Sequence, residues 1–387
     1  MKILFVTLRP LESNSSVTIS NFGLIKGFLE MNYQVDILMP YWNKERDLNY
    51  YYNEIAKKIN IVRIKGNASF EKLNTVQNSH LKSKLINVLK KVYYKISIFD
   101  HTKFFINYAD INTLNYTKYD IVISTSDPKT SHLFASKLKE QGLKYKVWIQ
   151  HWGDPLSLDI TRKSIFPKSY IKRIEEKILD DADKIIYVSP ITWIEQKKLF
   201  PKQSNKIHFV PLPYYKTVEH NKIKNNRFTI GYFGDYNSKI RNIIPLYEYV
   251  SDNKDLNLIV AGNSDLKLQS KENIKIYPRL KQDELGKLES ECDLLICICN
   301  KSGTQIPGKI YYYAATNKPI LIILDGEYKS EIRKFLSVYK RFHFCDNNMN
   351  SIGEKILELS NVLTNEKPCL DFSPKKIAKK IIEVANL

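Results

Sequence analysis

The sequence predicts an α/β protein made of two doubly wound domains in tandem. Short β-branched runs alternate along the chain with amphipathic stretches, a pattern typical of a parallel sheet covered by helices on both faces. The runs form two series with a polar segment between them. The length of 387 residues also suits about two domains of ~100 to 200 residues each.

The predicted strands follow the order of the chain. The first series comprises residues 2–7, 34–39, 59–64, 119–125, 145–150, 184–189 and 206–211. The second series comprises residues 227–233, 256–262, 274–278, 292–298, 319–324 and 341–345. We expect a ligand near the carboxyl ends of these strands, because open parallel sheets bind ligands at that edge.

The polar segment between the two series contains two prolines and has no apolar periodicity, so we interpret it as a linker. We expect a cleft to open beside it. Near the C-terminus, Ser373 is a good N-cap and Pro374 suits a first helical turn. The predicted division is therefore a first domain at 1–212, a linker at 213–226, a second domain at 227–370 and a C-terminal helix at 371–387 that packs back toward the first domain.

Composition excludes several classes of protein. Hydrophobic residues make up 43% and aromatic residues 12% of the chain, which argues against general disorder, and no run of 18 apolar residues is present to span a bilayer. The N-terminus has one lysine and a short apolar run without a small-residue cleavage site. We therefore expect a cytoplasmic protein without a secretory signal.

The five cysteines form no CxxC pair and have no histidine or cysteine partners at zinc spacing. We expect reduced core thiols and no metal. Asp181 and Asp183 have the DxD spacing of some metal sites. They follow an amphipathic stretch directly, however, and a solvated turn is the favoured interpretation.

The net charge of +19 predicts attraction to phosphate-bearing molecules. Nucleic acid, an anionic membrane and a sugar nucleotide all remain candidates on charge alone, and compositional bias accounts for part of the excess. Residues 81–99 form a basic amphipathic pattern, which either rests on an anionic membrane or packs onto its own domain. No recognition motif for nucleic acid accompanies the charge.

Three loops of the first domain carry candidate residues. The loop after residues 2–7 lacks a GxGxxG motif, which argues against a dinucleotide-binding enzyme, but Ser15 and Ser16 could contact an acceptor or phosphate. Asp127 follows the strand at 119–125 and is placed on the same acceptor side. His151 and Asp154 follow the strand at 145–150, where a histidine can donate to a sugar hydroxyl and a carboxylate can act as a base.

The second domain carries a candidate anion site. Gly234 allows a tight turn after the first strand, and Arg241 offers a bidentate donor for phosphate. Lys309 follows Pro307 and Gly308 at the start of a predicted helix, whose free amides also attract anions. Two cations and a helix start suit a diphosphate.

The predicted helix that starts near Pro307 should end at Asn317, in the left-handed conformation, before Pro319. It contains three consecutive tyrosines. Tyr312 shares a helix face with Lys309, whereas its two neighbours point elsewhere.

Four segments resemble a known family: HWGDP at 151–155, KILDDADKIIYVSP at 177–190, GYFGDYNSKIRN at 231–242 and DLLICICNKSGTQIPGKIYYYAATNKPIL at 293–321. On these segments the chain resembles GT-B glycosyltransferases, most closely the bacterial family 4-like group that builds capsule, O-antigen and other surface polysaccharides. The resemblance implies two Rossmann-like domains facing across a cleft. The last segment is the most specific, because it matches the family's loop and PGK helix start.

The resemblance implies a nucleotide-sugar donor in the second domain, with a UDP-sugar favoured over a GDP-sugar and no metal needed for the chemistry. The residues implied on the donor are Gly234, Arg241, Thr304, Gln305, Ile306, Pro307, Gly308, Lys309 and Tyr312. Tyr312 stands where the family has its ribose-binding glutamate, and Thr304 stands where it has the partner acid. A tyrosine hydroxyl offers one hydrogen-bonding group in place of two carboxylate oxygens.

The implied activity is hexosyl transfer, with retention as in family 4, to a saccharide or lipid-linked saccharide bound by the first domain. The protein would then work in the cytoplasm or on the inner face of the plasma membrane, without nucleic acid. Two other functions remain open. One is a GT-B nucleotide-sugar epimerase that uses the same site, and the other is a non-catalytic partner subunit.

Overall fold

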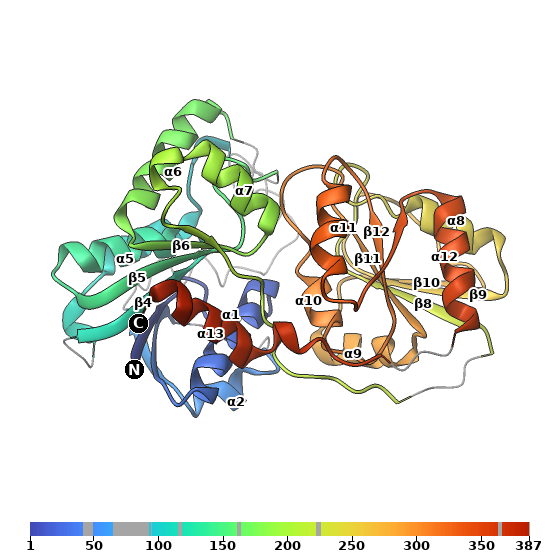
Figure 1. Cartoon of the computed structure of the whole chain (residues 1–387), viewed down its shortest axis with the longest axis horizontal. Coiled ribbons are helices and arrows are strands. Elements are labelled where there is room, and N and C mark those ends of the chain that lie inside the picture. The colour runs from blue at the N-terminus through green and yellow to red at the C-terminus, as the bar shows by residue number, and fades with distance from the viewer. Residues whose placement is uncertain are drawn as a thin grey trace, which may run out of the picture. The chain divides into compact units, whose positions relative to one another are not determined.

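The computed structural model describes residues 1–41, 49–64, 93, 95–114, 118–160, 164–221, 226–362 and 366–386. The chain separates into two compact units, Met1–Pro211 with Ile377–Leu387, and Leu212–Lys376. Figure 1 shows a parallel sheet flanked by helices in each of them. The predicted α/β class is confirmed.

The first unit is built on a parallel sheet of seven described strands in the order β3-β2-β1-β4-β5-β6-β7. Its strands are β1 (Lys2–Val6), β2 (Gln34–Pro40), β3 (Asn60–Ile64), β4 (Lys118–Thr125), β5 (Lys144–Trp152), β6 (Lys184–Tyr187) and β7 (Ile207–Phe209). Every strand coincides with one of the predicted runs. The order reverses direction between β1 and β4, which pair in register from Ile3 with Ile121.

Helices cover both faces of this sheet, as the buried β-branched strands require. In Figure 1, α5, α6 and α7 lie on one face, and α1, α2 and α13 lie on the other. Their bounds are α1 (Ser16–Glu30), α2 (Tyr52–Ala56), α5 (Thr130–Glu140), α6 (Lys168–Asp181), α7 (Pro190–Leu199) and α13 (Pro374–Ala385), with short 3-10 turns at His101–Tyr108, Ile111–Thr113 and Pro201–Gln203. The predicted helix start at Pro374 is confirmed.

Two buried tryptophans show how polar atoms are satisfied in this core. Trp148 Nε1 donates to the hydroxyl of Ser124 at 2.9 Å, and Trp152 Nε1 donates to Gln150 Oε1 at 3.1 Å. Both indole rings are almost completely buried, so each N–H needs such an acceptor.

The second unit has a parallel sheet of six described strands in the order β10-β9-β8-β11-β12-β13. Its strands are β8 (Phe228–Phe233), β9 (Leu256–Ala261), β10 (Ile274–Tyr277), β11 (Leu294–Ile298), β12 (Ile320–Leu324) and β13 (His343–Asp346). These strands also coincide with the predicted runs. The order reverses between β8 and β11, where Ile230 pairs with Leu294.

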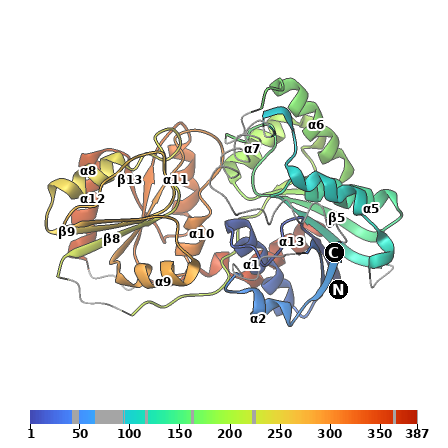
Figure 2. The ribbon, with the colours of Figure 1, turned by 180° about the vertical axis from the view of Figure 1, so that it is seen from behind.

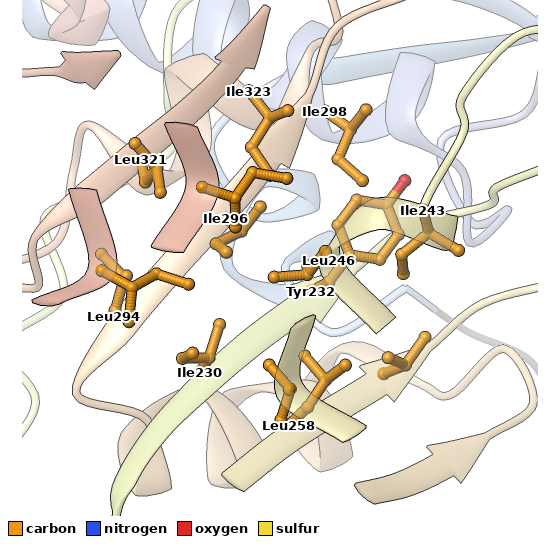
Figure 3. Close-up of a cluster of buried hydrophobic side chains, with 14 of the residues drawn as sticks. Ile230, Tyr232, Ile243, Leu246, Leu258, Leu294, Ile296, Ile298, Leu321 and Ile323 are labelled. Atoms are coloured by element: carbon orange, nitrogen blue, oxygen red, sulfur yellow. The ribbon is translucent and has the colours of Figure 1, made fainter. Parts of the chain in front are cut away.

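The helices of the second unit are α8 (Ile244–Asp252), α9 (Gln282–Glu291), α10 (Lys309–Tyr313), α11 (Lys329–Ser337) and α12 (Met349–Asn361), with a 3-10 turn at Leu370–Phe372. Figures 1 and 2 show α8 and α12 side by side against the sheet. The aliphatic core beneath them is drawn in Figure 3, where Tyr232 lies among side chains such as Ile243 and Ile298.

The segment interpreted as a linker, 213–226, is bonded along the second unit. Tyr214 N donates to Phe372 O at 3.1 Å, and Val218 N donates to Ala315 O at 3.0 Å. The side chain of Asn317 accepts from His220 N at 2.9 Å and donates to His220 O at 3.1 Å. Three long-range contacts therefore fix the described part of this segment to the second unit.

Two expectations about the helix near Pro307 are wrong. Helix α10 spans only Lys309–Tyr313, and Asn317 does not have a positive φ. The Thr316 hydroxyl donates to Tyr313 O at 2.8 Å, which ends the helix early, and Thr316 then forms a parallel bridge with Val218. The Asn317 side chain holds His220, so a tertiary contact rather than a left-handed cap sets this helix end.

The acidic cluster near Asp181 has structural partners. The carboxylate of Asp183 accepts from Trp148 N at 2.7 Å, and that of Asp181 accepts from the Ser136 hydroxyl at 2.7 Å. These bonds join the last residue of α6 to α5 and the turn that follows α6 to β5. The five cysteines are buried and form no disulfides, as predicted.

Most of the amphipathic pattern at 81–99 lies outside the described residues, so its prediction stays open. Among the helices that the structure describes, none combines the length and the apolar character needed to cross a membrane.

Candidate functional site

The strand order of the second unit places two loops side by side at the carboxyl edge of its sheet. Strands β9 and β10 are added on one side of β8 and strands from β11 onward on the other, so the strand order reverses between β8 and β11. Ligands of doubly wound sheets bind at such reversals. The loop after β8 carries Arg241, and the loop after β11 leads to Lys309. The two predicted cations therefore come from the loops that flank the reversal.

Arg241 is half-buried and held on several sides. Its Nε donates to Asn300 Oδ1 at 2.8 Å, and its Nη1 donates to Asp235 O at 3.4 Å. The hydroxyl of Tyr232 also lies against the guanidinium, and it donates to the same Asp235 carbonyl at 3.2 Å. These contacts fix the plane of the guanidinium before any ligand arrives.

Lys309 is the first residue of α10 and is also half-buried. Its Nζ lies 5.5 Å from the centroid of the Tyr313 ring. Burial lowers the pKa of Lys309 below its usual value, and the nearby carboxyl of Glu289 opposes that shift. An anion bound next to this ammonium would favour its charged form, so ligand and lysine stabilise each other.

Cys297 lies close enough to both Arg241 and Lys309 for their charges to act on its thiol. Burial nevertheless raises the pKa of its thiol to about 12. The thiol is therefore neutral at pH 7 and does not cancel the positive charge of the two cations.

Arg279 is a third cation at this edge that the sequence reading missed. It follows β10, and its Nη2 donates to Asp235 Oδ2 at 2.9 Å. The other oxygen of Asp235 accepts from Asn263 N at 2.9 Å. One carboxylate thus joins the loops after β8, β9 and β10. The available signal was that Arg279 stands directly after a predicted strand.

In this region, the glycine that allows two backbone segments to come close together is Gly262, not Gly234. A Cβ on Gly262 would lie 2.0 Å from the carbonyl oxygen of Gly234, whereas a Cβ on Gly234 would meet only the Tyr232 hydroxyl, at 3.9 Å. Gly234 also has no positive φ. The backbone of Gly234 is therefore closely packed not because of a tight turn at Gly234, but because residue 262, which lies against it, has no side chain.

Replacing Gly262 with alanine is expected to destabilise the second unit by about 1–3 kcal/mol, because the backbone at Gly234 must move. Calorimetric unfolding measures this loss. Gly286→Ala is the matched control, since a Cβ there meets nothing within 4 Å on helix α9, and alanine favours a helix by roughly 0.5–1 kcal/mol. Equal melting temperatures for the two variants would contradict the proposed contact.

The segment from Thr304 to Lys309 leads from the loop after β11 into α10. Thr304 and Pro307 are buried, and Gln305, Ile306 and Gly308 are half-buried. The backbone carbonyl of Gln305 accepts from Asn300 Nδ2 at 3.1 Å.

The three tyrosines of α10 differ in burial. Tyr311 and Tyr313 are buried, while Tyr312 is partly exposed. Tyr311 packs edge-on against Phe372, with ring centroids 5.0 Å apart. Tyr312 is therefore the tyrosine of the three with access to solvent, in line with the predicted helix face.

In the first unit, His151 lies near the end of β5 and is only 3% exposed. Burial lowers its pKa to about 4, so the imidazole is neutral at pH 7. A neutral ring can donate or accept one hydrogen bond but does not supply a positive charge. Its backbone carbonyl accepts from Ser126 N at 3.0 Å, which joins the ends of β4 and β5.

Asp127 and Asp154 lie around a lysine that sequence reasoning missed. Lys129 Nζ contacts Asp127 Oδ1 at 2.9 Å and Asp159 Oδ2 at 3.3 Å. Burial alone would lower the pKa of Lys129, but the carboxylates of Asp127, Asp159 and Asp154 outweigh it and raise the pKa. The lysine draws the loops after β4 and β5 together, which brings three acidic side chains into one group.

Glu175 of helix α6 holds the loop after β5, which carries Asp154. Its carboxylate is fully buried and accepts from Leu156 N at 2.8 Å, from Ser157 N at 2.7 Å and from the Ser157 hydroxyl. Burial raises the pKa of Glu175, while these hydrogen bonds oppose the rise. The loop that carries Asp154 is thus anchored to helix α6.

Ser15 and Ser16 begin helix α1. The Ser15 hydroxyl caps the helix by accepting from Thr18 N at 3.2 Å, and Ser16 is exposed. Capping gives Ser15 a structural role. Of the residues predicted as candidates in the first unit, the structure brings Asp127 and Asp154 together around Lys129.

No protein-family model matches the chain, and no curated protein matches it in sequence. Solved structures match it over its full length. TarM has a TM-score of 0.64 at 12% identity, over 100% of this chain and 99% of its own. HepE from Anabaena, solved in complex with UDP, has a TM-score of 0.58 at 12% identity, over 100% of both chains. A glycosyltransferase from Rickettsia africae has a TM-score of 0.54 at 13% identity, over 100% of this chain and 93% of its own.

The chain has the GT-B fold. The seven-stranded unit is the N-terminal GT-B domain, and the six-stranded unit is the C-terminal domain. The group of three cations therefore belongs to the C-terminal domain, and His151 belongs to the N-terminal domain. In the part of the chain that the structure describes, no three His, Cys, Asp or Glu side chains are grouped closely enough to hold a metal ion.

Proposed function

We propose that this GT-B protein is a glycosyltransferase, which moves a sugar from a nucleotide-sugar donor to a saccharide or lipid-linked saccharide. The observation that carries the proposal is the placement of Arg241 and Lys309 beside the strand-order reversal of the C-terminal domain, with Arg279 joined to the same edge through Asp235. Two cations at such a reversal suit the two phosphates of a nucleoside diphosphate.

The positive charge of these residues suggests how the bond between the sugar and the diphosphate is broken. When the bond between the sugar and the diphosphate breaks, negative charge grows on the departing phosphate oxygens. Arg241 and Lys309 would stabilise that charge, and Arg241 would do so without reorganisation because its guanidinium is already fixed by Asn300 and Asp235. Gly234, Tyr312 and the segment from Thr304 to Gly308 would line the rest of the donor site.

The acceptor end is assigned to the N-terminal domain. His151, as a neutral imidazole, would donate a hydrogen bond to a sugar hydroxyl, and Asp154 would accept a proton or orient it. Ser15, Ser16 and Asp127 would complete the acceptor side. We also assign retention of anomeric configuration and transfer of a hexose, which NMR analysis of the product tests directly.

Structural neighbours agree with a UDP-sugar as the donor. HepE from Anabaena was solved with UDP-glucose, and a TarM structure from S. aureus holds fondaparinux, α-GlcNAc-glycerol and UDP. WaaB, a lipopolysaccharide outer core galactosyltransferase, has a TM-score of 0.51 at 11% identity. By analogy we place the present protein in surface-polysaccharide synthesis, such as that of capsule or O-antigen, at the cytoplasmic face of the membrane.

Product analysis tests the proposal. Incubation with UDP-sugars and a panel of saccharide and lipid-linked acceptors should give a glycosylated acceptor and free UDP. Formation of an epimerised sugar nucleotide, or of free epimerised sugar and UDP, without added acceptor would identify an epimerase instead. Binding of UDP with no turnover over the whole panel would point to a non-catalytic partner subunit.

A further inference from the structure

Asn300 joins the two cationic loops of the C-terminal domain through one amide group. It lies two residues beyond β11 and is 7% exposed. Its Oδ1 accepts from Arg241 Nε at 2.8 Å, and its Nδ2 donates to the backbone carbonyl of Gln305 at 3.1 Å. Both ends of the amide are engaged, so its orientation is set by its partners.

The backbone around Asn300 is fixed from two sides. Lys301 N donates to Ile240 O at 2.7 Å, directly beside Arg241. On the other side, Gly326 approaches so closely that a Cβ would lie 2.2 Å from Lys301 O and 2.9 Å from Asn300 O. Asn300 therefore presents its amide from a rigid position.

The contact with Arg241 fixes the direction of the guanidinium without neutralising it. An arginine has five N–H donors in one plane, and a bond at Nε sets where the Nη groups point. The acceptor here is a neutral amide oxygen. A carboxylate in this position would form an ion pair with Arg241 and weaken its attraction for an anion.

The contact with Gln305 acts on the other cation. Gln305 lies four residues before Lys309 on the loop that enters α10. By holding the Gln305 carbonyl, Asn300 fixes the course of this loop relative to Arg241. A single side chain thus constrains the placement of both Arg241 and Lys309.

We propose that Asn300 is a positioning residue that holds the two cations in the arrangement a nucleoside diphosphate requires. The inference rests on the proposed function, because it names a further residue of the same donor site. Asn300 acts through Arg241 and Gln305 and need not touch the ligand.

The test is calorimetric titration with UDP of the full-length wild type and of Asn300→Ala. We expect the Kd of Asn300→Ala to rise about tenfold, the effect of losing a hydrogen bond to a charged group. Asn300→Asp should bind at least as weakly as Asn300→Ala, since its carboxylate pairs with Arg241. Wild-type affinity in either variant would overturn the inference.

Asn273→Ala is the matched control for folding. Asn273 is a buried asparagine of the same domain that donates to Val250 O at 2.8 Å and to Leu256 O at 3.0 Å, at the opposite edge of the sheet. Its loss should lower the melting temperature but leave the Kd unchanged. If Asn300→Ala does not fold, Asn300→Ser, which is also too short to bridge both partners, is measured in its place.

A double-mutant cycle with Arg241→Ala separates positioning from a general structural effect. If Asn300 acts through Arg241, Asn300→Ala should raise the Kd less than threefold, by rough estimate, once Arg241 is absent. Full additivity would overturn the inference. Failure of the wild type to bind UDP, GDP, ADP or CMP would contradict the proposed function itself, whereas loss in Arg241→Ala with none in the Asn300 variants would contradict only the role of Asn300.

Discussion

Replacing Arg241 with alanine is expected to lower kcat for sugar transfer by about 10²–10³, the usual effect of removing one preorganised donor from a developing anion. The guanidinium is already oriented by Asn300 and Asp235, so little of its interaction with the departing diphosphate is lost to reorganisation. Lys309→Ala should have an effect of similar size. Steady-state assays with the identified donor, which follow UDP release, measure both changes.

Arg227→Ala is the control for net charge. Arg227 precedes β8 at the opposite edge of the same sheet and pairs with Glu272 at 3.0 Å on the surface. This variant loses the same formal charge but should keep kcat within about twofold, since exposed pairs contribute ~0–1 kcal/mol. Full transfer by Arg241→Ala and Lys309→Ala would show that the diphosphate is held elsewhere.

Replacing Lys129 with methionine is expected to destabilise the N-terminal domain by about 3–5 kcal/mol, the effect of removing one partner from a buried ion pair. The lysine side chain is 11% exposed and lies between Asp127 and Asp159, with Asp154 nearby. Without the ammonium, these carboxylates would repel one another and draw the loops after β4 and β5 apart.

The pH dependence of this effect has a definite sign. The pKa of Lys129 is raised in the folded protein above the ordinary value of 10.5. Its stabilising contribution is therefore fully present below pH 10.5 and is lost only as the pH rises through the folded value. Lys129→Met lacks this contribution at every pH, so the difference in stability between the two proteins should shrink only as the pH rises above 10.5.

Tryptophan fluorescence during urea unfolding measures this loss in the N-terminal domain alone. All four tryptophans of the chain precede residue 212. Lys137→Met is the matched control, because Lys137 pairs with Glu140 at 2.7 Å on the surface of α5, where both side chains are exposed. Its effect should stay within about 0.5 kcal/mol. A similar effect for both variants would contradict a special role of the buried lysine.

The strands of both domains could be predicted from the sequence because each is a local β-branched run whose burial depends on the pattern of its own residues. The position of Arg241 and Lys309 at the carboxyl edge of the sheet could be predicted for a similar reason, as each comes soon after a strand of the parallel series. Asn300 could not, because its partner Arg241 is 59 positions away. Nothing local distinguishes it from an ordinary loop asparagine.

Contacts between residues distant in sequence also explain the predictions that were wrong or missing. The end of α10 depends on Asn317, whose partner His220 lies 97 positions earlier. The glycine that permits close packing is Gly262, and its contact with Gly234 is visible only when β8 and β9 lie side by side. Lys129 was missed because one of its acidic partners, Asp159, comes from the loop after the next strand.

The proposed function requires a nucleoside diphosphate to bind at the carboxyl edge of the C-terminal sheet. Calorimetric titration of the wild type and of Arg241→Ala with UDP, GDP, ADP and CMP tests this most directly. We expect one of the three diphosphates to bind in a saturable manner, CMP with its single phosphate to bind more weakly, and the Kd of the bound diphosphate to rise about 10- to 100-fold in Arg241→Ala. Absence of binding by all four nucleotides, or equal affinity in the two proteins, would contradict a diphosphate site at this edge.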